Sequence, residues 1–121
     1  NLDAAVMIGT DSPTFPGAFI TRAFESLLKN AAVLGKTTDG GFYLIGLRVL
    51  RKEIFENVEW SSPKTFEQTM RNIANYGSRL ALLPVWYDVD TPDDLKTLME
   101  DLAKNPACAP KTFEFMKNFY K

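Results

Sequence analysis

Aspartates that follow apolar strands are the residues of this sequence best placed to do chemistry. Asp11 comes directly after the apolar run at residues 4–9, and Asp88 and Asp90 come after the apolar stretch at residues 79–85. In open α/β sheets, ligands bind at the carboxyl ends of the strands, so polar residues at these positions are the first candidates for a site. The spacing at Asp11 leaves two roles equally open: a ligand for a bound group, or a turn or helix-capping residue before a proline.

Asp88 and Asp90 lie two residues apart, so in an extended segment both side chains leave the same face. Two neighbouring carboxylates repel each other unless a proton or a cation joins them, and a divalent metal is the natural partner. Taken alone, the pair is explained better by a solvated turn that opens the next helix. Asp93 and Asp94 belong to that helix start, where negative charge is favourable to the helix dipole.

Asp39, Gly40 and Gly41 form the third candidate. Paired glycines permit positive φ and a close approach of the backbone to a ligand, here with a carboxylate alongside. An ordinary hairpin turn requires the same residue types. Lys36 and Arg48 flank the segment and are available to phosphates, although a lone surface cation usually binds nothing specific.

The composition removes several kinds of chemistry. The 121 residues include no His, one Cys, and 14 Lys and Arg against 15 Asp and Glu. Without His, the usual neutral-pH general base, the His-dependent catalytic triads and the commonest zinc ligand are excluded. The balanced charge argues against nucleic-acid binding. A single Cys and the lack of an apolar run long enough to cross a bilayer predict a cytoplasmic protein.

Two further sets of residues receive a structural interpretation. The hydroxyls of Ser12 and Ser61 have no base to activate them, and the same holds for Ser62. The aromatic side chains of Trp60 and Trp86 suit packing better than a stacking platform for a ligand.

The apolar patterns predict strands that alternate with helices, and therefore an α/β sandwich with a mainly parallel, mixed sheet. The predicted strands cover residues 4–9, 31–34, 42–47 and 79–85. The first of them is apolar throughout, which suits a strand buried on both faces. Pro84 indicates that the last strand lies at an edge or ends there.

Helical spacing of apolar residues predicts the remaining elements. The predicted helices run from Pro16 to about residue 29, over residues 50–55, from Ser62-Pro63 to Gly77, over residues 91–104, and from residue 111 onward. Thr91, Pro92 and Asp94 have the spacing of a capped helix start. We expect residues 1–104 to form a partial α/β domain, with residues 105–121 as an aromatic helix that packs on it or extends from it.

Four segments, taken in order, form one pattern. They are VMIGTDSP at residues 6–13, LGKTTDGGFYLIGL at 34–47, EWSSPKTFEQT at 59–69 and LLPVWYDVDTPDDL at 82–95. Together they resemble an uncharacterised family of GT-A-type glycosyltransferases within the nucleotide-diphospho-sugar transferase superfamily. The resemblance covers most of residues 4–102 and implies the three-layer α/β sandwich of that superfamily.

The resemblance also implies roles for the acidic residues. Asp11 matches the aspartate that binds a divalent metal on the nucleotide phosphates, and Asp90 matches a second metal ligand, with Asp88 as a neighbouring candidate. Residues 39–41 match the segment that lines the sugar or acceptor pocket, and Asp11 and Asp39 are the residues assigned to catalysis. The metal implied is Mg²⁺ or Mn²⁺, which neutralises diphosphate charge as the bond to the transferred group breaks.

The function that the resemblance implies is a metal-dependent transferase whose substrate is a nucleotide sugar. One alternative is a nucleotidyltransferase that uses a nucleoside triphosphate at the same carboxylates. The other is a truncated, non-catalytic remnant that forms a homodimer or binds a partner. The resemblance also implies a further nucleotide-binding segment before the strand at residues 4–9, which the 121 residues do not include. The sequence is then either part of a longer protein or a truncated form that self-associates, and we expect that strand to have an uncovered edge in this chain.

Overall fold

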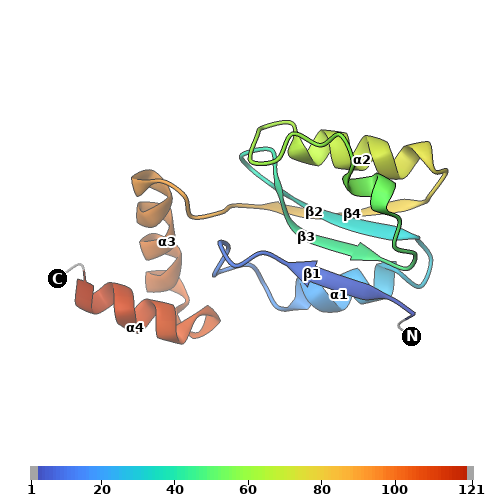
Figure 1. Cartoon of the computed structure of the whole chain (residues 1–121). Coiled ribbons are helices and arrows are strands. Elements are labelled where there is room, and N and C mark those ends of the chain that lie inside the picture. The colour runs from blue at the N-terminus through green and yellow to red at the C-terminus, as the bar shows by residue number, and fades with distance from the viewer. Residues whose placement is uncertain (1–2, 120–121) are drawn as a thin grey trace.

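Four strands in the order β1-β3-β2-β4 form a mixed sheet in the computed structural model, which describes residues 3–119 (Figure 1). Their bounds are Ala5–Ile8 for β1, Ala32–Thr37 for β2, Phe42–Leu47 for β3 and Leu80–Trp86 for β4. β3 pairs antiparallel with both β1 and β2, whereas β2 and β4 are parallel. Three strands therefore run in one direction and end at the same edge of the sheet, which confirms the predicted α/β fold.

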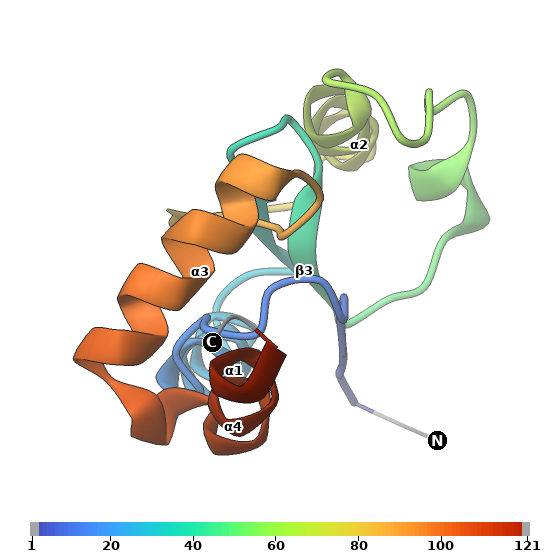
Figure 2. The same ribbon diagram turned by 90° about the vertical axis from the view of Figure 1, so that its left-hand side faces the viewer.

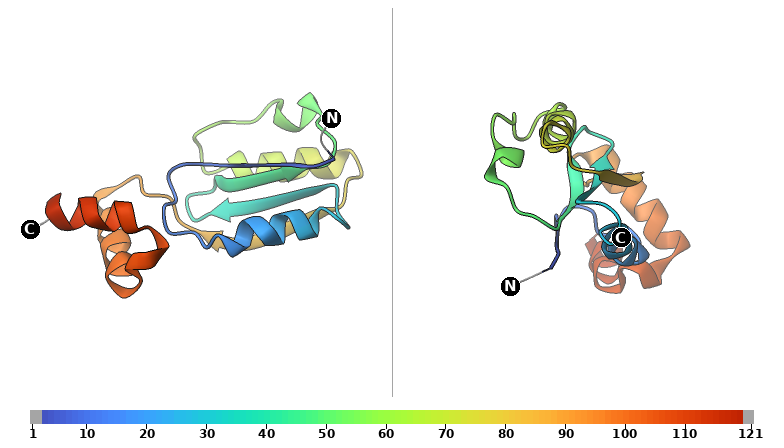
Figure 3. Two further views of the ribbon diagram at one scale, coloured as in Figure 1. Left: turned by 90° about the horizontal axis from the view of Figure 1, so that it is seen from below. Right: turned by 90° about the vertical axis from the view of Figure 1, so that its right-hand side faces the viewer.

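Two helices cover the opposite faces of this sheet (Figure 3). Helix α1, Ala18–Ser26, packs with Val33 of β2, and helix α2, Thr65–Asn75, packs with the next residue, Leu34. Because successive strand residues point to opposite faces, an apolar β2 is buried from both sides. The result is the predicted three-layer sandwich. Among residues 3–119, no helix combines the length and the apolar character that crossing a membrane would require.

The start of α2 differs from the prediction. Ser62 does not cap this helix, which begins three residues later, at Thr65. The Ser62 hydroxyl instead donates to the carbonyl oxygen of Glu59 at 2.8 Å and accepts from the backbone N–H of Lys64 at 3.1 Å. These bonds close a turn before the helix. The predicted end at Gly77 is confirmed by its φ of +64° just after the last helical turn.

Strand β1 differs from the expectation of a buried strand. Met7 is 64% exposed and Ile8 43% exposed. β1 also pairs with β3 on one side only and has no partner strand among the described residues on the other. The expected uncovered edge is therefore confirmed. β4 forms the opposite edge, as Pro84 within it predicts.

The C-terminal helices α3, Pro92–Lys104, and α4, Pro110–Phe119, lie together beyond one end of the sheet (Figures 1 and 2). A short 3-10 helix, η2 at Pro106–Cys108, joins them, and another, η1 at Lys52–Phe55, replaces the helix predicted over residues 50–55. Leu98, Leu102 and Met116 form a buried cluster of their own. Residues 120 and 121 of the predicted aromatic tail lie outside the described part of the chain.

The buried Tyr43 yields a prediction about pH. Its hydroxyl donates to the carbonyl oxygen of Pro84 at 2.8 Å, and burial raises its pKa from 10.0 to about 12, partly opposed by Arg22. Because the folded-state pKa lies above the unfolded one, this group stabilises the fold fully below pH 10 and loses that contribution as the pH rises towards about 12. Urea unfolding at a series of pH values should show the free energy of unfolding falling over this range.

The variant Tyr43→Phe isolates this effect. At pH 7 the loss of the hydrogen bond should lower the free energy of unfolding by about 1 kcal/mol. Between pH 10 and 12 the variant should lose stability less steeply than the unsubstituted protein, because it has one tyrosine fewer to ionise. Equal slopes in the two proteins would contradict the prediction.

Candidate functional site

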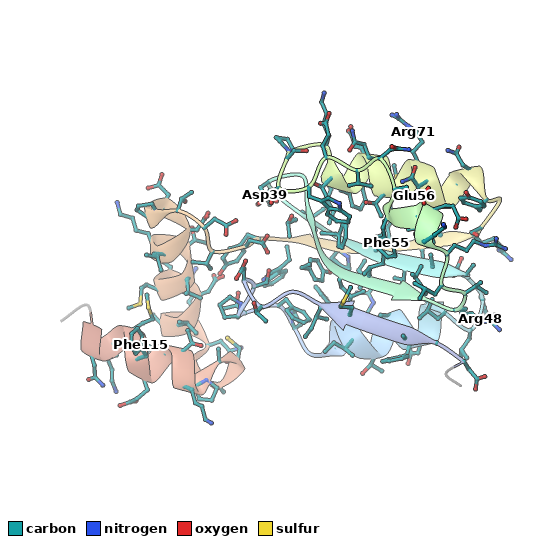
Figure 4. All side chains as sticks on the ribbon, viewed as in Figure 1. Asp39, Arg48, Phe55, Glu56, Arg71 and Phe115 are labelled. Atoms are coloured by element: carbon teal, nitrogen blue, oxygen red, sulfur yellow. The ribbon has the colours of Figure 1, made fainter. Side chains whose placement is uncertain are left out.

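Loops that follow the three co-directional strands meet at one edge of the sheet and enclose an open cavity of about 640 Å³. Four aspartates line it, namely Asp11, Asp39, Asp88 and Asp90. No Lys or Arg of residues 3–119 is among its lining residues. Figure 4 shows Asp39 at this end of the sheet and Arg48 at the opposite end. The cavity is therefore a concentration of negative charge without a protein cation.

Backbone hydrogen bonds hold these loops together. The N–H of Val89 donates to the carbonyl oxygen of Asp11 at 2.7 Å, which joins the loop after β1 to the loop after β4. The N–H of Thr38 donates to the carbonyl oxygen of Trp86 at 2.9 Å, which brings in the loop after β2. The convergence of residues more than 70 positions apart thus follows from parallel strand direction and from these cross-loop bonds.

Three of the carboxylates form a close group. One oxygen each of Asp39, Asp88 and Asp90 lies within 4.8 Å of the other two. Asp11 lines the same cavity but does not belong to this group. The resemblance implies Asp11 and Asp90 as the metal ligands, with Asp88 as a neighbouring candidate. The structure groups Asp90 and Asp88 with Asp39, which the resemblance assigned to the sugar or acceptor pocket and to catalysis, and not with Asp11.

Neighbouring polar groups orient two of these carboxylates. One oxygen of Asp39 accepts from the buried Thr37 hydroxyl at 2.5 Å and from the N–H of Gly41 at 3.1 Å. One oxygen of Asp88 accepts from the buried Ser12 hydroxyl at 2.6 Å. Each carboxylate is fixed through one oxygen, which leaves its second oxygen for a ligand.

The capping box of α3 fixes the backbone at Asp90. The carboxylate of Asp94 accepts from the N–H groups of Asp90 and Thr91, both at 3.0 Å, and the Thr91 hydroxyl accepts from the N–H of Asp94 at 3.1 Å. The hydrogen bond from Asp90, followed by those from Thr91, lowers the pKa of Asp94. The structural role predicted for Asp94 is confirmed, and the same box places Asp90 at the cavity.

Electrostatics at the site oppose the charged forms. Loss of solvation raises the pKa of Asp88, and the neighbouring charges of Asp39 and Asp11 raise it further against the opposing Ser12 hydrogen bond. The same causes raise the pKa of Asp90, with Asp88 as the largest neighbouring charge. A cation would remove this repulsion. Carboxylate oxygens are the hard ligands that Mg²⁺ and Mn²⁺ prefer, so the residues present fit such an ion.

The glycine pair serves both a turn and a close approach. The N–H of Gly40 donates to the carbonyl oxygen of Thr37 at 3.2 Å, within the β2–β3 hairpin. Gly40 also has φ +93°, and a Cβ there would lie 2.2 Å from the carbonyl oxygen of Pro63. Gly40 therefore allows the loop before α2 to approach the hairpin, while Gly41 lines the cavity.

Sequence reasoning missed the second wall of the cavity. Phe42, Trp60 and Ser61 line it, although Trp60 was interpreted as packing and Ser61 as inert. Lys36 does not line it, and its ammonium instead lies 5.4 Å from the centre of the Phe66 ring. Of the signals available, only the turn residues around Ser62-Pro63, next to a tryptophan, indicate a loop that presents an aromatic side chain.

Comparisons with known proteins identify the family and support the fold. The model of a family described as "Uncharacterized protein conserved in bacteria (DUF2064)" matches residues 1–62, half of the chain. A crystal structure of a "putative nucleotide-diphospho-sugar transferase from Desulfovibrio desulfuricans G20" matches with a TM-score of 0.87 and 28% sequence identity. The match covers 96% of this chain and 51% of that one, so the chain spans about half the length of the solved structure. No curated protein matches the sequence significantly.

Proposed function

Since the chain belongs to the DUF2064 family of uncharacterised bacterial proteins, and since its fold matches about half of the solved structure of a putative nucleotide-diphospho-sugar transferase, we propose that it carries the metal site of a transferase acting on nucleotide-diphospho-sugars. The observation that carries the proposal is the group of Asp39, Asp88 and Asp90, whose oxygens lie within 4.8 Å of one another in a cavity that Asp11 also lines. The predicted resemblance to an uncharacterised family of this superfamily is confirmed; the activity is our proposal.

Asp39, Asp88 and Asp90 would hold the cation, and Asp11 would stand beside it in the cavity. When bound, Mg²⁺ or Mn²⁺ would supply positive charge for a diphosphate group, which is otherwise repelled by a cavity with four carboxylates. The Thr37 and Ser12 hydroxyls hold Asp39 and Asp88 in place before any ligand arrives. Such support of ligand residues is what gives a metal site its affinity.

Positioning rather than nucleophilic attack by the protein accounts for the proposed reaction. The chain has no His. The two hydroxyls that donate to the carboxylates, those of Ser12 and Thr37, are buried and do not line the cavity, so neither is placed to act as a nucleophile on a bound substrate. A transferase that holds its two substrates in line and stabilises the leaving diphosphate needs none. A nucleotidyltransferase would use the same carboxylates, and analysis of products from nucleoside triphosphates and from nucleotide sugars separates the two.

The variant Asp90→Ala tests the proposal. Isothermal titration of Mn²⁺, followed by UDP- and GDP-sugars, should show metal-dependent binding to the unsubstituted chain. Asp90→Ala should weaken this binding at least about tenfold, because it removes one of the three grouped carboxylates that would hold the metal.

Asp93→Ala is the matched control, since Asp93 lies in the first turn of α3 and outside the lining of the cavity. It changes the net charge by the same amount and should bind as the unsubstituted chain does. The proposal fails if Asp90→Ala also binds unchanged.

A further inference from the structure

Trp60 lines the same cavity as the group of Asp39, Asp88 and Asp90, but the proposed metal chemistry does not use it. It lies on the loop between η1 and α2, and 52% of its surface is exposed. Large aromatic side chains carry much apolar surface, and one left open inside a polar cavity is a feature of ligand sites. The exposed part of the Trp60 ring is therefore a candidate contact for the ligand.

The ring of Trp60 packs against two other aromatic rings. Its centre lies 6.3 Å from that of Phe42 in an edge-to-face arrangement and 6.4 Å from that of Phe55 in a stacked one. The loop that carries it is tied to α2, because the Thr65 hydroxyl donates to the carbonyl oxygen of Glu59 at 2.7 Å. A side chain that is fixed in advance loses little conformational entropy when a ligand binds to it.

The same loop is tied to α2 a second time and reaches an unusual backbone conformation next to the ring. The N–H of Glu59 donates to the side-chain oxygen of Gln68 at 2.7 Å. Ser61 then has φ +57°, which is uncommon for a residue other than glycine and is retained where the surroundings impose it. Both Trp60 and Ser61 line the cavity, so the strained residue places an aromatic face and a hydroxyl-bearing side chain side by side.

This combination of groups fits a sugar ring better than a nucleobase. One face of a pyranose presents C–H bonds with partial positive charge, which the negative face of an aromatic ring attracts. The rim of the sugar is a ring of hydroxyls, and the cavity offers carboxylate and serine oxygens to bond them. A flat base would use the aromatic face but would leave most of these polar groups without partners.

We propose that Trp60 is the stacking platform for the pyranose ring of a substrate, with Ser61 as its hydroxyl-binding neighbour. The inference deepens the proposed transferase function and rests on it. It assigns the sugar end of the ligand to the loop at residues 57–62, next to the carboxylates that would hold the cation. The ring contributes affinity and specificity for the sugar, and no bond is made or broken at it.

The test uses the indole N–H signals of the full chain in ¹H–¹⁵N NMR spectra. The protein has two tryptophans, and Trp86→Phe assigns the signal of Trp60. With Mg²⁺ present, UDP-glucose, UDP-N-acetylglucosamine and GDP-mannose are each compared with UDP or GDP alone, and methyl glycosides form a further arm. At least one sugar-bearing ligand should shift the Trp60 signal beyond the shift that its nucleotide causes. A shift by methyl glycosides marks an acceptor sugar, and a shift by nucleotide sugars alone marks the donor sugar.

Substitution of the ring provides the quantitative readout. Trp60→Ala should weaken binding of the shifting ligand about tenfold and leave the affinity for UDP or GDP and for Mg²⁺ unchanged, while Trp60→Phe should retain most of the binding. Equal shifts with nucleotide and nucleotide sugar would overturn the proposal in favour of base stacking, and so would unchanged sugar affinity in Trp60→Ala. If glycosides shift the signal but neither Mg²⁺ nor nucleotide binds, the platform stands and the transferase proposal fails. If no probe shifts it, the platform proposal fails, and the transferase proposal is decided separately by whether Mg²⁺ and nucleotide bind.

Discussion

The double variant Asp88→Asn, Asp90→Asn is expected to lose at least about a hundredfold in affinity for Mn²⁺ and to be no less stable than the unsubstituted chain in metal-free buffer. Loss of a group that merely supports a metal ligand costs 10- to 100-fold, and here two of the three grouped carboxylates are replaced. Asn keeps the size of Asp but removes the charge. Because loss of solvation and neighbouring carboxylates disfavour both charges in the fold, removing them relieves repulsion.

Thermal unfolding with and without Mn²⁺ checks both halves of this expectation. A ligand that binds only the folded state raises its apparent stability in proportion to the logarithm of ligand concentration over Kd. The unsubstituted chain should therefore gain in Tm with Mn²⁺, whereas the double variant should not. Asp93→Asn serves as the charge control and should respond as the unsubstituted chain does. A variant that loses stability in metal-free buffer and still responds to Mn²⁺ would show that these carboxylates are structural.

The second large effect is expected for Gly40→Ala, which should lower the free energy of unfolding by about 3 kcal/mol or more. Two costs add at this position. With φ +93° any side chain is strained, at about 1–3 kcal/mol. The new Cβ would also lie 2.2 Å from the carbonyl oxygen of Pro63, which is backbone and cannot rotate away, and such overpacking costs about 1–3 kcal/mol.

Gly77→Ala separates the two costs. Gly77 has φ +64°, but a Cβ there would meet nothing within 4 Å, so this variant carries strain without a clash and should lose only about 1 kcal/mol. Urea unfolding of both variants measures the difference. Similar losses at the two positions would contradict the close approach that the structure shows at Gly40.

The substitution of Gly40 should also change the structure of the loop that lines the cavity. The carbonyl oxygen of Gly40 accepts from the N–H of Phe66 at 2.8 Å, which ties the hairpin to the start of α2. The loop just before that helix carries Trp60. We therefore expect the Trp60 indole signal to move in Gly40→Ala even without ligand, and to keep its position in Gly77→Ala.

The edge of the sheet at which the site forms can be predicted from the sequence, because it follows from the direction of the strands. Apolar runs that alternate with helical patterns predict co-directional strands, so residues that follow them, such as Asp11 and Asp88, must meet at one end. The helix start at Thr91 was equally accessible, because the capping box depends on residues within one turn of each other. Short-range rules and strand direction therefore suffice for these features.

The sequence does not predict in the same way which aspartates form the close group. Asp39 joins Asp88 and Asp90 because β2 and β4 are neighbours in the sheet, and no pattern along the chain states the strand order. The exposure of Met7 has the same origin, since an apolar run does not reveal whether its strand is central or at an edge. At Ser62 a local turn competed with the cap, and its bonds to Glu59 and Lys64 decided the outcome.

Anomalous scattering from crystals grown with Mn²⁺ tests the central claim most directly, because it locates the ion without any assumption about activity. We predict an anomalous peak in direct contact with carboxylate oxygens of Asp39, Asp88 and Asp90, at the cavity edge of the sheet. A peak bound elsewhere, or none at Mn²⁺ concentrations that saturate a titration, would contradict it.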